Sequence, residues 1–121
     1  MSGDTRCVEA MLSGWNTRDA NVLEQVVQQS LTSDLEFCDP HYDISGHAAF
    51  IEMVKAFWAK NGECKITRTS TIDTHHDRAR YGWVIKWPDG RRFEGFDAVA
   101  LDHTSGKVRR VDGFFGALSP I

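Results

Sequence analysis

The chain has 121 residues, enough for one hydrophobic core and too few for two ordinary domains, so we expect a single domain spanning residues 1–121. Apolar residues make up 41% of the chain, charged residues 26%, and the net charge is -3. This balance excludes general disorder and argues against nucleic-acid binding through phosphate neutralisation. No apolar run approaches the roughly 18 residues of a membrane span, and the first four residues lack the features of a secretory signal. We therefore expect a cytoplasmic protein without membrane contact.

The first half of the chain predicts three amphipathic helices and one short strand, because apolar residues recur at helical spacing in three separate windows. The first helix has Ser2 or Asp4 available at its start, and the third ends naturally at Gly62, since glycine accepts the backbone conformation of a helix C-cap. The expected elements are a helix from about Asp4 to Trp15, a second helix from about Val22 to Leu31, a strand over residues 35–38, a loop through Ile44, and a third helix from Ser45-Gly46 to Asn61-Gly62.

After Gly62 the sequence changes to runs of β-branched and aromatic residues separated by turn signals, which predicts an antiparallel meander. We expect its strands at about residues 63–74, 78–87, 92–101 and 107–115. Helices followed by a long antiparallel sheet define an α+β fold, in which the helices cover one face of the sheet.

Side-chain alternation along these strands predicts an aromatic inner face. The second strand places Tyr81, Trp83 and Ile85 on one side, and the third strand places Asp97 on the same side as its apolar residues. A carboxyl at a core-facing position costs free energy unless it is hydrogen-bonded or neutral, so Asp97 is a candidate site residue. Two other readings stay open: Asp97 bonds a buried backbone amide, or the register is shifted by one residue and Asp97 faces water.

Other candidate chemical groups carry weaker signals. The three cysteines are widely spaced, and none belongs to a Cys-x-x-Cys pair. Asp39, His41 and Asp43 alternate along one loop and could bind a divalent metal, but such loops are more often solvated. His47 could reach a pocket mouth as a proton shuttle or remain in solvent, and His75-His76 is typical of a turn. We expect no metal site.

The order of several short motifs resembles the nuclear transport factor two-like superfamily, and within it the SnoaL-like proteins and ketosteroid isomerase. The likeness covers nearly the whole chain. The motifs are the Trp15-to-Asp19 step between the first two helices, Phe37-Cys38-Asp39-Pro40 at the end of the first strand, Gly46 opening the third helix, and the closing run from Gly95-Phe96-Asp97 to Gly113-Phe114-Phe115.

This resemblance implies a cone-shaped roll in which three N-terminal helices pack on a strongly curved, mixed and mostly antiparallel sheet. It also implies an apolar pocket at one end, and many members dimerise through the outer face of the sheet. Carried over residue by residue, the catalytic base of ketosteroid isomerase matches Asp39, and its protonated oxyanion-hole aspartate matches Asp97. The oxyanion-hole tyrosine falls near Met11 or Trp15, neither of which has a phenol hydroxyl.

We therefore expect a cofactor-independent isomerase or cyclase of the SnoaL-like group, which moves protons on a small apolar carbonyl compound with Asp39 and Asp97 as catalytic residues. The alternative is a non-catalytic module of the same fold that binds a small molecule or dimerises. In either case the partner copy, if present, is expected on the outer sheet face. The residues expected to line the pocket are Trp15, Phe37, Tyr81, Trp83, Ile85, Phe93, Val111 and Phe115.

Overall fold

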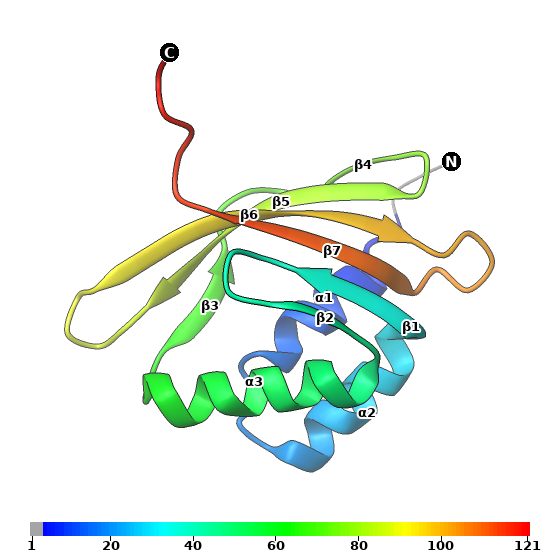
Figure 1. Ribbon diagram of the computed structural model, residues 1–121, viewed down its shortest axis with the longest axis horizontal. Helices are drawn as coiled ribbons and strands as arrows, with labels where there is room; N and C mark the ends of the chain where they lie inside the picture. Colours follow the sequence, from blue (N-terminus) through cyan, green and yellow to red (C-terminus); the bar gives the residue numbers. More distant parts are fainter. Residues whose placement is uncertain (1–3) are drawn as a thin grey trace.

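The computed structural model describes residues 4–121, which form three helices and a seven-stranded sheet. Figure 1 shows the helices gathered on one side of the curved sheet, so the predicted α+β roll is confirmed. In chain order the elements are α1 (Arg6–Gly14), α2 (Ala20–Ser30), β1 (Leu31–Cys38), β2 (Asp43–Ser45), α3 (His47–Asn61), β3 (Lys65–Arg68), β4 (Asp73–His75), β5 (Arg78–Lys86), β6 (Arg92–Leu101) and β7 (Val108–Phe115).

The strands follow the order β2-β1-β7-β6-β5-β3, and β4 pairs with β5 beside β3. β1 and β7 are parallel, whereas the pairs β5–β6 and β6–β7 are antiparallel, so the sheet is mixed and mostly antiparallel as expected. The parallel pair joins the first strand of the chain to the last one. This pairing places the end of β1, which precedes Asp39, beside the last strand of the predicted meander.

The second helix was predicted to extend to Leu31, and this was wrong. Asp19 caps α2 by accepting hydrogen bonds from the backbone N–H groups of Asn21 and Val22 at 2.9 and 3.1 Å, and the helix ends at Ser30. Leu31 has extended backbone angles and starts β1, where it pairs with Val108. Leu31 is buried in either state, so apolar periodicity could not distinguish them.

Three other predicted elements differ from the structure. β1 begins at Leu31, before residue 35, and its pairing with β7 has a register irregularity between Leu31 and Glu36. The predicted loop through Ile44 and the predicted helix start at Ser45 are replaced by the short strand β2, which pairs with the end of β1, and α3 begins at His47. The predicted strand over residues 63–74 is divided into β3 and β4, because Ser70 leaves the strand and its hydroxyl accepts a hydrogen bond from Gly82 N–H at 2.9 Å.

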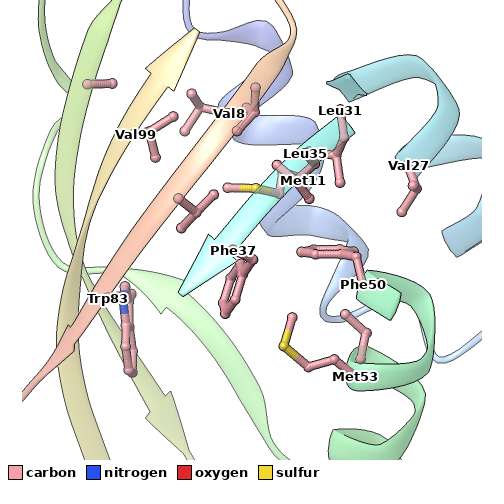
Figure 2. Close-up of a cluster of buried hydrophobic side chains, with 14 of the residues drawn as sticks. Val8, Met11, Val27, Leu31, Leu35, Phe37, Phe50, Met53, Trp83 and Val99 are labelled. Atoms are coloured by element: carbon pink, nitrogen blue, oxygen red, sulfur yellow. The ribbon is translucent and has the colours of Figure 1, made fainter. Parts of the chain in front are cut away.

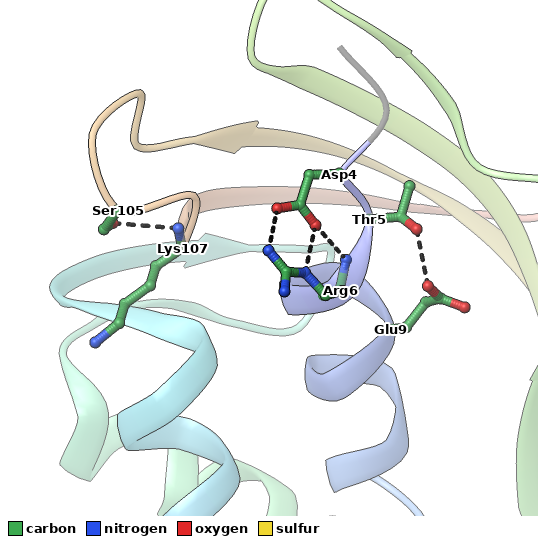
Figure 3. A network of polar contacts seen from close by, with 6 residues as sticks. All are labelled: Asp4, Thr5, Arg6, Glu9, Ser105 and Lys107. Carbon is green, nitrogen blue, oxygen red and sulfur yellow. Dashed lines mark hydrogen bonds and ion pairs between the residues drawn. The ribbon is translucent and has the colours of Figure 1, made fainter. Parts of the chain in front are cut away.

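The first helix starts slightly later than predicted, at Arg6. Ser2, one of its two expected starting residues, lies outside the described residues. The other, Asp4, precedes the helix and accepts hydrogen bonds from the backbone N–H and the guanidinium of Arg6, as Figure 3 shows. Thr5 donates to the Glu9 carboxylate at 2.8 Å and closes the first turn. These contacts are exposed, so they organise the start of α1 without contributing much stability.

The hydrophobic core lies between the helices and the inner face of the sheet (Figure 2). Val8, Leu35 and Val99 are almost fully shielded from solvent and fill one part of this space. Phe37 and Met53 belong to the same buried cluster, but they also border an open space farther along the sheet. The core therefore fills only part of the roll and leaves a cavity in the remainder.

Candidate active site

A cavity of about 340 Å³ lies between the inner face of the sheet and helices α1 and α3. Most of its lining is aromatic or aliphatic, with a few polar side chains among them, as is usual for small-molecule sites. Its lining residues are Met11, Leu12, Trp15, Phe37, Asp39, His41, Tyr42, Met53, Ala56, Phe57, Lys60, Asn61, Ile66, Trp83, Ile85, Trp87, Phe93, Asp97, Gly113 and Phe115.

Strand register places both predicted catalytic carboxylates in one row across the sheet. Asp97 of β6 pairs with Tyr81 of β5 on one side and with Gly113 of β7 on the other. β1 ends at Cys38, which pairs with the residue before Gly113, so Asp39 follows at the level of Gly113. Two strand spacings, about 10 Å, thus separate the backbones of Asp97 and Asp39. Both residues line the cavity.

The position of residue 113 decides how closely the two carboxylates face each other. A Cβ atom on Gly113 would lie 3.1 Å from Oδ1 of Asp97 and 3.2 Å from Cβ of Asp39. Glycine leaves this volume empty, so the space between the two side chains opens into the cavity. The side chains of Asp97 and Asp39 therefore border the same part of the cavity.

Asp97 is buried, with 9% of its surface exposed, and its hydrogen bonds come from side chains. The Tyr81 hydroxyl donates to Oδ2 at 2.8 Å, and the Trp83 indole donates to Oδ1 at 3.0 Å. Burial raises the pKa of Asp97 to about 6, because desolvation outweighs the two hydrogen bonds, which lower the pKa, and the nearby charge of Asp39 adds to the increase. At pH 7 Asp97 is mainly a carboxylate, yet it accepts a proton far more readily than an exposed aspartate.

Asp39 is held by its own loop. Its Oδ1 atom accepts hydrogen bonds from the backbone N–H groups of His41 and Tyr42 at 2.8 and 2.9 Å, and its own N–H donates to the Tyr42 carbonyl. These bonds fix the carboxylate at the end of β1. His41 and Tyr42 also line the cavity, and the His41 ring contacts the edge of Phe115 with centroids 5.2 Å apart.

Aromatic residues of β5, β6 and β7 form one wall of the cavity, as the alternation predicted. Phe93 and Phe115 lie edge to face with centroids 4.9 Å apart, and Trp83 contacts both rings. Phe93 is 40% exposed, so this cluster reaches the cavity mouth. The expected pocket residues Trp15, Phe37, Trp83, Ile85, Phe93 and Phe115 line the cavity.

Tyr81 and Val111 were also expected in the lining, and both lie outside it. Tyr81 is buried, and its hydroxyl donates to the carboxylate of Asp97, which does line the cavity. Val111 is completely shielded from solvent in the core. Both residues have the predicted inward orientation. Alternation along a strand predicts which face of the sheet a side chain is on, but it does not predict whether the side chain meets the core or the cavity there.

Sequence reasoning did not identify the contribution of α3 to the site. Met53, Phe57, Lys60 and Asn61 lie along one side of this helix and line the cavity. The apolar periodicity of the sequence instead indicates a face with Phe50, Val54 and Trp58, because Lys60 and Asn61 are polar and do not fit an apolar pattern. It does not indicate which part of the sheet the face covers.

The histidines and the suggested metal ligands have other positions. The Nε2 atom of His47 lies 3.0 Å from the Leu31 carbonyl oxygen, and His47 is not among the cavity residues. His75 ends β4, and His76 follows it in a turn with positive φ. Within residues 4–121, no group of three or more His, Cys, Asp or Glu side chains is arranged to hold a metal ion. In the same range, no helix is both long and apolar enough to cross a membrane.

Comparisons with known proteins support the fold assignment. A SnoaL-like family protein from Agrobacterium tumefaciens strain C58, provisionally named an isomerase, has a TM-score of 0.85 and 26% identity over 93% of this chain and 96% of its own. An NTF2-like protein of unknown function from an Exiguobacterium species has a TM-score of 0.74 and 15% identity, covering 93% and 99% of the two chains. A protein from Kribbella flavida provisionally named a ketosteroid isomerase has a TM-score of 0.72 and 18% identity, covering 96% and 80%.

No family model matches the sequence, and no curated protein matches it. The structural relationships nevertheless define the class: this is an α+β roll of the nuclear transport factor 2-like type. Its structure is similar to those of SnoaL-like and ketosteroid isomerase-like proteins, in line with the resemblance of its motifs. The names of these relatives support an isomerase-type function only loosely, since many proteins of this fold have unknown functions.

Proposed function

We propose that the protein is a cofactor-independent enzyme of isomerase or cyclase type that moves a proton on a small apolar carbonyl compound. The observation that carries the proposal is the buried carboxylate of Asp97, which borders an apolar cavity and has a pKa of about 6. A base with this pKa is largely ionised at neutral pH and still has a strong tendency to take a proton, which is the compromise that general base catalysis requires.

The first step follows from the position of Asp97. Its carboxylate takes a proton from the carbon next to the substrate carbonyl, the C–H electron pair forms the enolate double bond, and the negative charge moves to the carbonyl oxygen. The proton then returns to another carbon in an isomerisation. In a cyclisation, the enolate carbon attacks a second carbonyl of the same molecule, and that carbonyl oxygen takes up a proton.

This mechanism gives the two aspartates different roles from those implied by ketosteroid isomerase. Tyr81 and Trp83 donate to Asp97, which favours its ionised form, so we assign Asp97 as the base and not as a neutral hydrogen-bond donor. Asp39 contributes negative charge beside it and raises its pKa. His41 and Tyr42 line the cavity next to Asp39 and provide candidate donors to the developing oxyanion.

The test is hydrogen–deuterium exchange at the α-carbon of β-tetralone, an uncharged apolar ketone, followed by proton NMR in D₂O. We expect the wild-type protein to accelerate the exchange over buffer, and Asp97→Asn to reduce that acceleration by about 100-fold or more. Asparagine can retain both contacts, because its oxygen accepts from Trp83 and its amide donates to the Tyr81 hydroxyl. A small molecule that binds without accelerated exchange would instead support the non-catalytic module.

We also propose that two copies associate through the outer face of the sheet. Phe96 and Phe114 are paired neighbours on β6 and β7, and their rings stack with centroids 5.4 Å apart. Phe114 remains 52% exposed, and Ala98 extends the same face. Large apolar groups exposed together on a sheet are typical of an interaction surface.

A further inference from the structure

A positive charge borders the cavity at the C-terminal end of α3. Among the described lining residues, Lys60 is the one side chain with a permanent positive charge, and the two carboxylates of the lining are Asp39 and Asp97. Lys55, on the same helix, pairs with Glu52 at 3.5 Å. Within residues 4–121, Lys60 has no carboxylate partner of this kind, so its charge is available to a ligand.

Lys60 and Asp97 lie toward different ends of the cavity. The Trp87 indole donates to the carbonyl of Asn61 at 3.0 Å, which fixes the end of α3 against the residue that follows β5. Tyr81, the strand partner of Asp97, precedes Trp87 by about 20 Å of extended chain. Between the two ends the lining is mainly apolar and includes Phe57, Ile85 and Met53.

We infer that the substrate is an apolar carbonyl compound with an anionic group, most simply a carboxylate, which Lys60 binds while the reacting carbon lies near Asp97. This inference rests on the proposed function and specifies its substrate class. The protein has a net charge of -3, so long-range electrostatics disfavour anions and any preference for one must come from a local contact. Asn61 lines the same end of the cavity, but its amide nitrogen donates to the Phe57 carbonyl at 3.0 Å, so the preference for an anion rests on Lys60.

Lysine in the last turn of a helix also has a purely structural explanation, because its charge complements the helix dipole. The two explanations differ in what they predict for ligands. A structural lysine affects the stability of α3 and is indifferent to the charge of a bound molecule. A binding lysine changes the relative affinities of a carboxylate and its uncharged amide.

The experiment measures dissociation constants of 4-biphenylacetate and 4-biphenylacetamide by isothermal titration calorimetry at low ionic strength. We expect the wild-type protein to bind the carboxylate about fivefold more tightly than the amide, which is what one partly exposed ion pair provides. Lys60→Met should abolish this preference, and Lys60→Arg should retain it. Lys55→Met, which removes a paired charge from the same helix, is the matched control and should retain it too.

Equal binding of the two compounds by the wild-type protein would overturn the inference, as would binding of neither compound or a preference that persists in Lys60→Met. Added salt should weaken the preference, because the pair is partly exposed. Failure of this inference is distinguishable from failure of the proposed function. The exchange experiment uses β-tetralone, which carries no charge for Lys60 to bind.

Discussion

The indole N–H of Trp83 donates a hydrogen bond to Oδ1 of Asp97 at 3.0 Å, although the two residues are 14 positions apart in the sequence. Trp83 pairs with Gly95, whose lack of a side chain lets the indole lie across β6. The same tryptophan therefore forms part of the apolar wall and, like Tyr81, lowers the pKa of Asp97 against the larger effect of burial. Packing and chemistry at this site are linked through a single side chain.

Replacing Trp83 with Phe should raise the pKa of Asp97 above about 6. The substitution keeps an aromatic ring in the wall but removes a hydrogen bond that stabilises the ionised carboxylate. A shift of about one unit is expected, and ¹³C NMR titration of the Asp97 carboxyl measures it. Trp87→Phe is the matched control, because the Trp87 indole also lines the cavity but donates to Asn61. An unchanged titration in Trp83→Phe would contradict this assignment.

Asp97 should make the folded state less stable as the pH rises. The folded pKa of about 6 lies above the ordinary aspartate pKa of 3.8, so the folded protein binds more protons than the unfolded chain between these values. The contribution of Asp97 to the free energy of unfolding is largest below about pH 4, decreases as the pH rises through 6, and is constant at higher pH. The total change is about 3 kcal/mol.

Urea unfolding of wild type and Asp97→Asn at pH 4 and pH 7.5 tests this expectation, because contributions from distant groups cancel in the difference between the two proteins. Asp97→Asn should gain stability relative to wild type at the higher pH. If the difference between the two proteins is the same at both pH values, Asp97 does not titrate as described.

Gly113→Ala should impair function more than folding. The new methyl group would lie 3.1 Å from Oδ1 of Asp97 and 3.2 Å from Cβ of Asp39, so one or both side chains would have to move by a few tenths of an ångström. We expect α-proton exchange to decrease about tenfold and the free energy of unfolding to decrease by about 1 kcal/mol.

Gly14→Ala is the control for this substitution. Its methyl group would meet Leu23 at 3.3 Å, a similarly tight contact, but in the packing between α1 and α2. Exchange should remain at the wild-type rate in Gly14→Ala. Equal losses of activity in the two variants would show that tight packing in general, and not the gap between the carboxylates, is responsible.

Phe114→Lys should weaken the proposed pairing of two copies, since it places a charge in the stacked pair on the outer face of the sheet. Sedimentation velocity should show a dimer for wild type and a monomer for the variant. Val22→Lys, at an exposed position on α2, should remain dimeric. A monomeric wild-type protein at micromolar concentration would contradict the pairing.

Much of the roll could be predicted from the sequence, because apolar and polar residues alternate regularly along β5 and β6. The turns between the strands also contain typical turn residues. The inward orientation of Asp97 followed from this alternation alone. Its proximity to Asp39 did not, because it depends on the parallel pairing of β1 with β7, which are distant in sequence. Only the family resemblance suggested that these two residues act together.

Two other features of the site required the structure. Tyr81 faces inward but stays behind Asp97, a difference of depth that period-two alternation does not encode. Lys60 joins the lining because the end of α3 packs beside Trp87, and a helix pattern gives a buried face without its position along the sheet. Local sequence patterns thus predicted which way a side chain faces better than where along the sheet it lies.

The pH dependence of α-proton exchange is the most direct test of the proposed role of Asp97. With β-tetralone as the substrate, the wild-type rate should increase tenfold per unit below pH 6 and level off above it, because only the carboxylate form of Asp97 accepts the proton. The small rate of Asp97→Asn should lack this inflection. A wild-type profile without an inflection near pH 6, or equal rates in the two proteins, would contradict the assignment of Asp97 as the catalytic base.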